Sequence, residues 1–460
     1  MAYTRPSDAL HLSRRNLLQA AAGLVLGSAG PLVSCTAGEA RRVRPIRRVT
    51  HGPRFHWFGY YDKLQFDPSN RYLLANEVEF EHRTPGPQDK LRVGMVDLED
   101  GDRWIPLGES NAWGWQQGCM LQWRPGSRSE VVWNDREGDR FVARILNVET
   151  GARRTLPLPL YTLSPDGRFG LSADFARIQR MRPGYGYVGL EDPHREERAP
   201  EDAGIWRTDL DSGEVRLVLS LAHVAGLPHE GHSLEGRWHY FNHLLVSPDS
   251  SRFIVLHRWR RHLWYPRFVL SLAGFVTRML TVAVDGSELF VLDPSGKTSH
   301  FIWRDEDHVC AWTKPSGRES GFYLFRDRTR EVEQVGEGVM AENGHITYLD
   351  LPGRQWILND TYPGLLNREQ TPYLYHVPSR RRWDLGHFPL PMRYQGEYRC
   401  DLHPRSSNDG GLVAIDSPHE GRGRQIYLFD VSDLFGPGIQ SLPNGKVNLG
   451  LAHGIAEGGS

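Results

Sequence analysis

The feature that most constrains the fold is a pattern of short strands and turns that recurs seven times between residues 60 and 430. Each unit has an apolar strand, a turn rich in Pro, Asp, Asn or Gly, a strand of β-branched and aliphatic residues, and a third strand before an Asp/Gly-type turn. The units recur at roughly 40 to 60 residues, the range of propeller blades. A single blade cannot bury its apolar face alone, so neighbouring blades stack around a channel. The sequence therefore predicts an all-β fold, a seven-bladed β-propeller.

The ends of this array suggest how the ring closes. The seventh unit lacks an obvious fourth strand, and Pro45–Thr50 just before the first unit can supply it. Closure matters because an open propeller would leave a long unpaired strand edge. We expect a linker and possible ring-closing strand over 36–50, the propeller over 51–435 and a C-terminal tail over 436–460. Two separate β domains are the alternative, but no long linker between the units favours them.

The first 35 residues are typical of an export signal. Ser13–Gln19 contains the twin-arginine pattern, an apolar stretch rich in small residues runs from Leu17 to Leu32, and Leu32–Cys35 resembles a lipobox. A membrane-spanning helix is the alternative, and the stretch is too short and too rich in Ala, Gly and Ser for one. We expect export by the twin-arginine pathway, lipidation at Cys35, and a periplasmic or cell-envelope lipoprotein.

Charge, hydropathy and cysteine spacing argue against a nucleic-acid partner, a membrane-spanning segment and a disulfide framework. The formal net charge is −1, and the propeller carries no basic stripe of the kind that binds nucleic acid. The most apolar later segment, 268–276, is far too short to span a membrane, so we expect membrane contact only through the lipid anchor. Cys119, Cys310 and Cys400 are an odd, scattered set, which favours small buried residues over a disulfide framework.

Blade geometry indicates which polar residues meet. The start of the innermost strand and the loop after the second strand lie on one face of a propeller, and four successive units carry a histidine at the first of these positions. The four are His243, His300, His345 and His403. Imidazoles around a channel mouth suit a divalent metal such as Mn²⁺ or Zn²⁺, with Ca²⁺ as a further candidate. The alternative is a ring of hydrogen bonds between blades.

The longest insertions belong to the loops on this same face. One spans 177–203 and contains the segment Arg182-Pro183-Gly184-Tyr185-Gly186-Tyr187, and another spans 260–276. Long loops gathered on one rigid face are where sites are usually built.

From Asn242 onward the chain resembles the oligogalacturonate lyases, seven-bladed propellers akin to the TolB-like propellers. Asn242-His243 followed by Leu256–Trp259 looks like the blade that carries that family's base, and Ser299–Trp303 looks like the next blade, with a metal-binding histidine. Asp401–Pro404 stands where the family supplies its last metal-binding group. The family groups a glutamine and two histidines there, whereas this chain has Arg399, Asp401 and His403, with Gln395 upstream.

The resemblance implies β-elimination on a uronate-containing glycan, so that the partner is an acidic oligosaccharide. His243 is the candidate base that removes the proton beside the carboxylate. A metal on His300, His345 and His403, or else Arg258, would neutralise that carboxylate as enolate-like charge develops. A tyrosine, among Tyr61, Tyr161 and Tyr185, would protonate the leaving oxygen or stack on a sugar. We take His243, Arg258 and Tyr161 as the candidate catalytic set.

Two other functions fit the same pattern. A non-catalytic propeller would bind a protein or a glycan at the cell envelope. A hydrolase would use a pair of carboxylates, chosen from Asp62, Glu79, Asp360 and Glu420. A lyase is distinguished from the binding propeller by an unsaturated product that disappears when His243 is replaced.

Overall fold

The computed structural model describes residues 44–231, 233–261, 276–364 and 367–435. The expected signal peptide with Cys35, most of the 260–276 insertion and the C-terminal tail lie outside the described residues. No described helix is long and apolar enough to cross a membrane.

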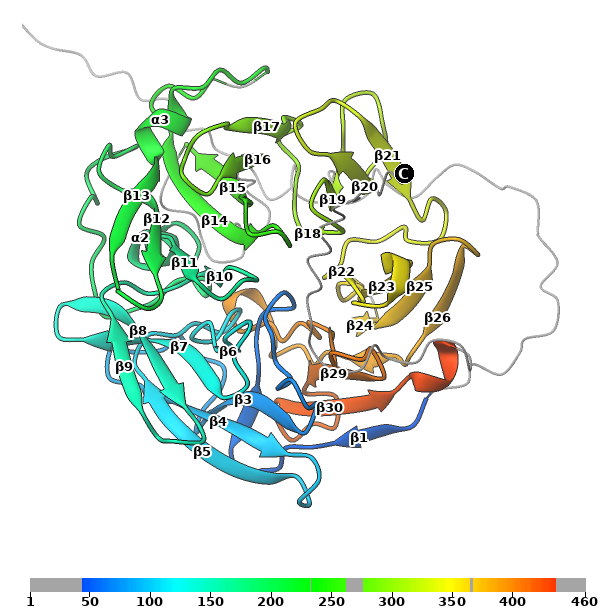
Figure 1. The fold of residues 1–460 in the computed structure, drawn as a ribbon. Coiled ribbons are helices and arrows are strands. Elements are labelled where there is room, and N and C mark those ends of the chain that lie inside the picture. The colour runs from blue at the N-terminus through cyan, green and yellow to red at the C-terminus, as the bar shows by residue number, and fades with distance from the viewer. Residues whose placement is uncertain (1–43, 232, 262–275, 365–366, 436–460) are drawn as a thin grey trace, which may run out of the picture. The chain divides into compact units, whose positions relative to one another are not determined.

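The described chain forms seven four-stranded antiparallel sheets arranged as blades in a ring (Figure 1), which confirms the predicted seven-bladed β-propeller. The first blade has β2 (Phe55–Trp57), β3 (Tyr72–Val78), β4 (Leu91–Asp97) and β5 (Arg103–Ser110). The second has β6 (Gln122–Trp123), β7 (Glu130–Glu137), β8 (Arg140–Asn147) and β9 (Arg153–Leu156). The third has β10 (Thr162–Leu163), β11 (Phe169–Ser172), β12 (Gly204–Asp209) and β13 (Val215–Ser220).

The remaining blades follow the same order. The fourth has β14 (Trp238–Val246), β15 (Arg252–Arg260), β16 (Val276–Ala283) and β17 (Phe290–Asp293). The fifth has β18 (Phe301–Trp303), β19 (His308–Thr313), β20 (Gly321–Arg326) and β21 (Val332–Val335). The sixth has β22 (Thr347–Tyr348), β23 (Trp356–Asn359), β25 (Tyr373–His376) and β26 (Arg381–Asp384). The seventh has β28 (Arg405–Ser406), β29 (Leu412–Ser417) and β30 (Gln425–Asp430).

Few elements stand outside the blades. β24 (Glu369–Gln370) and β27 (Phe388–Pro389) pair with each other. The short helices are α2 (Phe175–Met181), α3 (Leu221–Ala225), η1 (Pro352–Arg354), η2 (Gly396–Tyr398) and η3 (Ser432–Phe435). α2 lies in the insertion of the third blade, where Asp174 caps it by accepting from the Arg177 amide at 2.9 Å.

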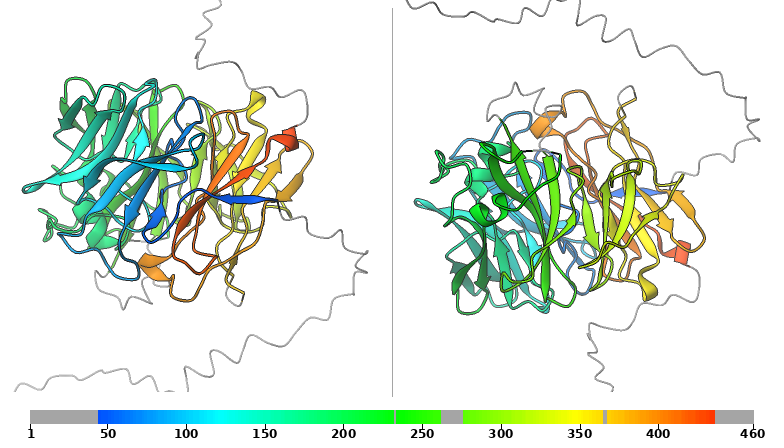
Figure 2. Two further views of the ribbon diagram at one scale, coloured as in Figure 1. Left: turned by 90° about the horizontal axis from the view of Figure 1, so that it is seen from below. Right: turned by 90° about the horizontal axis from the view of Figure 1, so that it is seen from above.

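The strand before the first blade belongs to the last one. β1 (Ile46–Arg48) pairs antiparallel with β30, with Ile46 opposite Phe429, and becomes the fourth strand of the seventh blade. Figure 2 shows β1 in blue running alongside the orange strands of that blade. Chain segments almost 400 residues apart in sequence are thereby hydrogen-bonded through the sheet.

Aromatic side chains fill the space between blades. Trp57 packs against Trp113 at 5.9 Å and Trp115 at 5.3 Å between ring centroids, and all three are at most 2% exposed. Tilted and edge-to-face pairs at this spacing add to the burial of apolar area. The predicted burial of Cys119, Cys310 and Cys400 as free thiols is confirmed.

The segment that follows the first strand of the first blade contacts a distant blade. β2 begins at Phe55 and ends at Trp57. Residues 58–64 then leave the sheet, and Tyr61 donates its hydroxyl to the carbonyl of Phe301 in the fifth blade at 2.8 Å. This excursion puts two tyrosines at the centre of the ring.

A buried carboxylate ties the seventh blade to the first. Asp416 accepts from the amides of Phe58 and Gly59 at 3.1 Å each and from Arg405 Nη2 at 2.9 Å, and both charged side chains are at most 2% exposed. Replacing Asp416 with Ala strands a buried guanidinium and two amides, so we expect the free energy of unfolding to fall by about 3–5 kcal/mol in denaturant titration.

The matched control is Asp433→Ala, which breaks the Arg44–Asp433 pair on the same blade. Asp433 is 70% exposed, so this change should cost less than about 1 kcal/mol. Equal losses for the two variants would contradict the assignment of Asp416 as a tie between the blades.

Candidate functional site

The four predicted histidines converge at the centre of the ring. His243, His300, His345 and His403 come from the fourth to the seventh blades, and each is between 2% and 6% exposed. The ring of His345 lies 4.5 Å from that of His300 and 4.3 Å from that of His403, between centroids, and His243 is 6.4 Å from His300. The convergence expected from blade geometry is present.

A bulge aims His243 at this centre. The pairing of β14 with β15 shifts register between Asn242 and Leu244, and the extra residue, His243, has a φ of +54°. Its amide donates to Tyr161 Oη at 3.0 Å and to Asn242 Oδ1 at 2.8 Å. Bulges re-aim side chains next to active sites, and this one turns the His243 side chain toward the other histidines. His403, with a φ of +42°, has the same unusual backbone.

Hydrogen bonds assign the two ring nitrogens of His243 different roles. The Tyr161 hydroxyl donates to Asn242 Oδ1 at 2.9 Å, so Tyr161 Oη can only accept from His243 Nδ1, 3.4 Å away. Nε2 is then the unprotonated nitrogen, and it accepts from Tyr60 Oη at 3.2 Å. Burial, together with the charges of Arg258 and Arg182, holds the pKa of His243 well below its usual value. The imidazole is therefore neutral at neutral pH.

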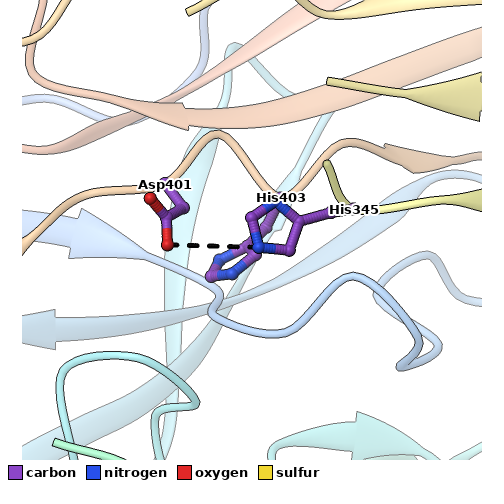
Figure 3. Close-up of side chains that lie close together, drawn as sticks. All are labelled: His345, Asp401 and His403. Carbon is purple, nitrogen blue, oxygen red and sulfur yellow. Dashed lines mark ion pairs between the residues drawn. The ribbon is translucent and has the colours of Figure 1, made fainter. Parts of the chain in front are cut away.

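Three of the converging groups can hold a metal ion. One ligand atom from each of His345, Asp401 and His403 lies within 4.8 Å of the others (Figure 3). His403 Nε2 is buried without a hydrogen-bond partner among the described residues, and burial with neighbouring positive charge lowers the pKa of His403 well below its usual value. Two imidazoles and a carboxylate are a donor set suited to a divalent transition metal. The residues therefore fit a metal ion.

His345 has a partner behind it that orients it for this role. Asp360 Oδ1 and Oδ2 lie 2.9 and 3.0 Å from His345 Nδ1, and Asp360 also accepts from the His345 amide at 2.7 Å. The pair fixes Nδ1 as the protonated nitrogen and leaves Nε2 facing Asp401, 4.0 Å away. A carboxylate behind a ligating histidine is a recurrent arrangement in metal sites.

This contact makes a prediction about metal affinity. Asp360→Asn is expected to weaken binding of Mn²⁺ or Zn²⁺ by about 10- to 100-fold, because the ring orientation and basicity of His345 are lost. Competition with a chromophoric chelator measures the affinity directly. Asp305→Asn is the matched control. Asp305 Oδ1 lies 2.8 Å from His308 Nδ1, and neither residue belongs to the candidate metal-binding group. Unchanged affinity in Asp360→Asn would contradict this role.

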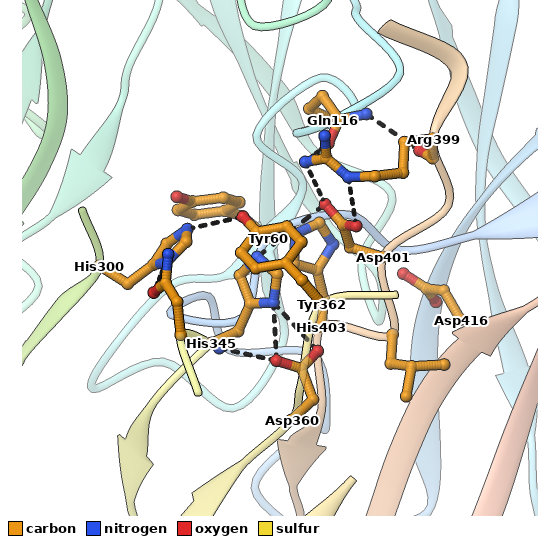
Figure 4. Close-up of polar contacts among 12 residues, drawn as sticks. Tyr60, Gln116, His300, His345, Asp360, Tyr362, Arg399, Asp401, His403 and Asp416 are labelled. Atoms are coloured by element: carbon orange, nitrogen blue, oxygen red, sulfur yellow. Dashed lines mark hydrogen bonds and ion pairs between the residues drawn. The ribbon is translucent and has the colours of Figure 1, made fainter. Parts of the chain in front are cut away.

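Asp401 is also held by an arginine. Arg399 donates from Nε and Nη2 to the two oxygens of Asp401 at 2.5 and 2.6 Å, and Gln116 holds the same turn by donating to the carbonyls of Glu397 and Arg399 (Figure 4). Burial would raise the pKa of Asp401, but the charge of Arg399 outweighs it and the pKa lies below its usual value. Asp401 is therefore an ionised carboxylate.

His300 occupies a neighbouring position. It is not one of the three close ligands found among the described residues, and its Nδ1 lies 3.0 Å from Asn343 Oδ1 while its Nε2 lies 3.2 Å from Tyr362 Oη. The predicted metal set was His300, His345 and His403, whereas the closest grouping in the structure has Asp401 as its third member.

Solved structures share this architecture. An oligogalacturonate lyase from Vibrio parahaemolyticus superimposes with a TM-score of 0.60 and 14% identity over 86% of this chain and 96% of that chain. An oligogalacturonate lyase in complex with manganese superimposes with a TM-score of 0.59 and 14% identity over 88% of this chain and 98% of that chain.

The fold is that of the oligogalacturonate lyases. This confirms the resemblance at the level of fold. No protein-family model matches the sequence, and no curated protein matches it at a significant level.

The other two residues of the predicted catalytic set, Arg258 and Tyr161, are both buried. Arg258 is 2% exposed on β15, and burial with the charge of Arg182 lowers its pKa to about 10. Tyr161 is fully buried, and its oxygen accepts from Gln117 Nε2 at 2.7 Å besides its contacts with Asn242 and His243. Tyr161 thus supports His243 from behind.

The carboxylates proposed for hydrolysis are each engaged with basic groups. Asp62 contacts Lys63 at 2.8 Å, Asp360 holds His345, Glu79 lies near Arg54 and Arg92, and Glu420 contacts Arg48. Glu79 and Glu420 are 70% and 39% exposed, whereas Asp360 is fully buried at the centre.

Several residues of the site were not predicted to belong to it. Tyr60 stacks on His243 at 5.0 Å between centroids, Arg182 lies among the central tyrosines, and Tyr362 reaches His300. Arg182 belongs to an insertion that sequence analysis placed on this face, which was the available signal.

Proposed function

We propose that this chain is a metal-dependent lyase that cleaves uronate-containing oligosaccharides by β-elimination. The observation that supports the proposal most is the meeting, on one face of the propeller, of a neutral histidine base, two arginines and a His/Asp metal-binding group. Both oligogalacturonate lyases with this fold act, by their names, on an acidic oligosaccharide, and one holds manganese. Export as an envelope lipoprotein, expected from residues 1–35, is part of the proposal.

The chain's own groups divide the reaction between them. His243 Nε2 removes the proton on the carbon beside the uronate carboxylate, and the electrons of that bond form the new double bond as the glycosidic oxygen departs. Arg258 and Arg182, whose charges both act on His243, stabilise the enolate-like charge on the carboxylate. A divalent cation bound by His345, Asp401 and His403 would supply Lewis-acid stabilisation of the same carboxylate.

Burial strengthens these interactions. Every side chain named in this reaction is at most 4% exposed, apart from Arg182, which is half-buried. Electrostatic stabilisation is larger where water is excluded.

A substrate screen tests the proposal. The protein, loaded in turn with Mn²⁺, Zn²⁺ or Ca²⁺, is incubated with oligosaccharides of different uronates and with matched neutral oligosaccharides. The expected result is new ultraviolet absorbance from an unsaturated uronate, seen only with acidic substrates and reduced by a chelator. Absence of this absorbance with every uronate would reject the lyase and favour a propeller that only binds.

A further inference from the structure

The loop after α2 holds one tyrosine in a fixed place. In Arg182-Pro183-Gly184-Tyr185-Gly186, a side chain at Gly184 (φ +92°) would put its Cβ 2.9 Å from Glu397 Cβ, and at Gly186 only 2.2 Å from the backbone of Phe175 and Gln179. Both neighbours of Tyr185 must therefore be glycine for the loop to pack this closely. The loop has the close packing expected of a segment that positions a side chain.

Tyr185 faces the proposed base. Its ring lies 5.9 Å from that of His243, edge-on at 86°, and it is 7% exposed. Arg182 Nη2 donates to Tyr185 Oη at 3.0 Å, and the guanidinium carbon lies 4.0 Å from the centre of the phenol ring. Because a guanidinium has no acceptor, the hydroxyl proton of Tyr185 is not used in this contact.

The other two candidate tyrosines, Tyr161 and Tyr61, use their hydroxyl protons elsewhere. Tyr161 donates to Asn242 Oδ1 at 2.9 Å, and Tyr61 donates to the carbonyl of Phe301 at 2.8 Å. Both contacts are structural, since one supports the bulge at His243 and the other joins the first blade to the fifth. Tyr185 is the member of the three that accepts a hydrogen bond from an arginine, a group that can only donate.

We propose that Tyr185 is the catalytic residue that protonates the departing glycosidic oxygen, and that Arg182 is a positioning residue that holds it and stabilises its phenolate. This inference rests on the proposed elimination. The substrate that fits is a uronate with an unactivated sugar as leaving group, because a sugar alkoxide needs a proton as it departs.

The step balances without a further reactant. His243 takes the proton from carbon, the electrons of that C–H bond form the double bond, and the C–O bond breaks with its electron pair on oxygen. The Tyr185 proton moves to that oxygen, which leaves a phenolate and an imidazolium. Return of the proton from His243 to Tyr185, through solvent, resets the site.

The electrostatic surroundings agree with this role. Burial alone would raise the pKa of Tyr185, but the charges of Arg182 and Arg399 outweigh it, and the pKa lies below the usual value for tyrosine. A phenol made more acidic by neighbouring arginines is a stronger proton donor to an alkoxide.

The test compares Tyr185→Phe with wild type on two substrates. On an oligouronate, kcat is expected to fall by about 10²- to 10⁴-fold, the usual contribution of a general acid. On a synthetic uronide whose eliminated group is an acidic phenol, which needs no proton, the variant should stay within about tenfold of wild type, since that contribution is no longer required. Equal losses on both substrates would overturn the proposal.

Tyr187→Phe is the matched control. Tyr187 is two residues away, and its hydroxyl meets Asn134 Nδ2 at 2.8 Å in the core, stacked on Phe175. Its removal should leave both rates unchanged. If Tyr187→Phe lowered kcat on the oligouronate as much as Tyr185→Phe does, the proposal would also be overturned, because disturbance of the loop would then explain the losses in both variants.

A second readout needs no activity. The phenolate absorbance of wild type minus that of Tyr185→Phe is titrated with pH, and it should rise below about pH 10, the usual pKa of tyrosine. Arg182→Gln should move this rise upward. A rise at or above the usual value would overturn the proposal. If the wild type forms no unsaturated uronate from any substrate, the proposed function itself fails. If the wild type is active and Tyr185→Phe is equally active, only the present inference fails.

Discussion

His243→Asn is expected to lower kcat for elimination by about 10²- to 10⁴-fold, the range by which a positioned general base accelerates proton transfer. Asparagine is chosen because it adopts left-handed backbone more readily than most residues, so the φ of +54° at this bulge is kept. Its amide has no basic nitrogen, and no other group then takes the proton from carbon. Initial rates from the absorbance of the unsaturated product measure the loss.

Metal content and thermal stability separate a missing base from a damaged site. Both should match wild type in His243→Asn, because the metal-binding group lies on the sixth and seventh blades. His308→Gln, at the start of β19 in the fifth blade, where His308 contacts Asp305, serves as the histidine control and should retain full activity. If His243→Asn kept activity within a few-fold of wild type, His243 would not be the base.

The double variant His345→Gln with His403→Asn is expected to lose the bound metal. Removing only the partner behind a ligand costs about 10- to 100-fold in metal affinity, so removing two ligands should weaken binding by more than about 100-fold. Elemental analysis of the purified protein, after loading with Mn²⁺, Zn²⁺ or Ca²⁺ and gel filtration, gives the stoichiometry. Asparagine again suits position 403, where φ is +42°.

The control for this variant must lose two buried histidines elsewhere. His239 and His257, whose rings stack at 5.0 Å on the neighbouring strands β14 and β15 of the fourth blade, provide it as His239→Gln with His257→Gln. That protein should keep its metal if it folds, as circular dichroism will show. Metal retained by the His345/His403 variant would place the ion elsewhere, and a metal-free wild type would leave arginine-assisted elimination.

Sequence periodicity was sufficient to predict the ring of histidines. His243, His300, His345 and His403 occupy equivalent positions in successive repeats, and in a propeller equivalent positions meet at the axis. The seven-bladed fold followed from the same repeats, because each blade needs neighbours to bury its faces. The motifs that resemble the oligogalacturonate lyases indicated the fold that the structural comparison confirms, although the superimposed chains share only 14% sequence identity.

Contacts across the ring could not be predicted in the same way. Residues 58–64 leave the first blade, and the hydroxyl partners of Tyr60 and Tyr61 lie far away in sequence, at His243 and at the carbonyl of Phe301. The bulge at His243 is invisible in a period-two pattern, since one inserted residue looks like a continued strand. Asp401 enters the metal-binding group because of distances between the sixth and seventh blades.

The charges at the centre compensate one another through buried contacts. Arg399 neutralises Asp401, and Asp360 orients His345, so that an ionised carboxylate persists where burial alone would favour its neutral form. Burial, together with the charges of Arg258 and Arg182, holds the pKa of His243 well below its usual value. In the proposed elimination, the same two arginines also receive the substrate carboxylate.

The mass spectrum of the products formed from an oligouronate by the metal-loaded protein tests metal-assisted elimination most directly. Elimination predicts a pair of fragments, one of which is lighter by one water than the matching hydrolysis fragment, and their disappearance in His243→Asn and in the His345/His403 variant. Fragments that all carry the added water would identify a hydrolase, and an intact substrate that remains bound would identify a binding propeller. Either outcome would contradict the lyase.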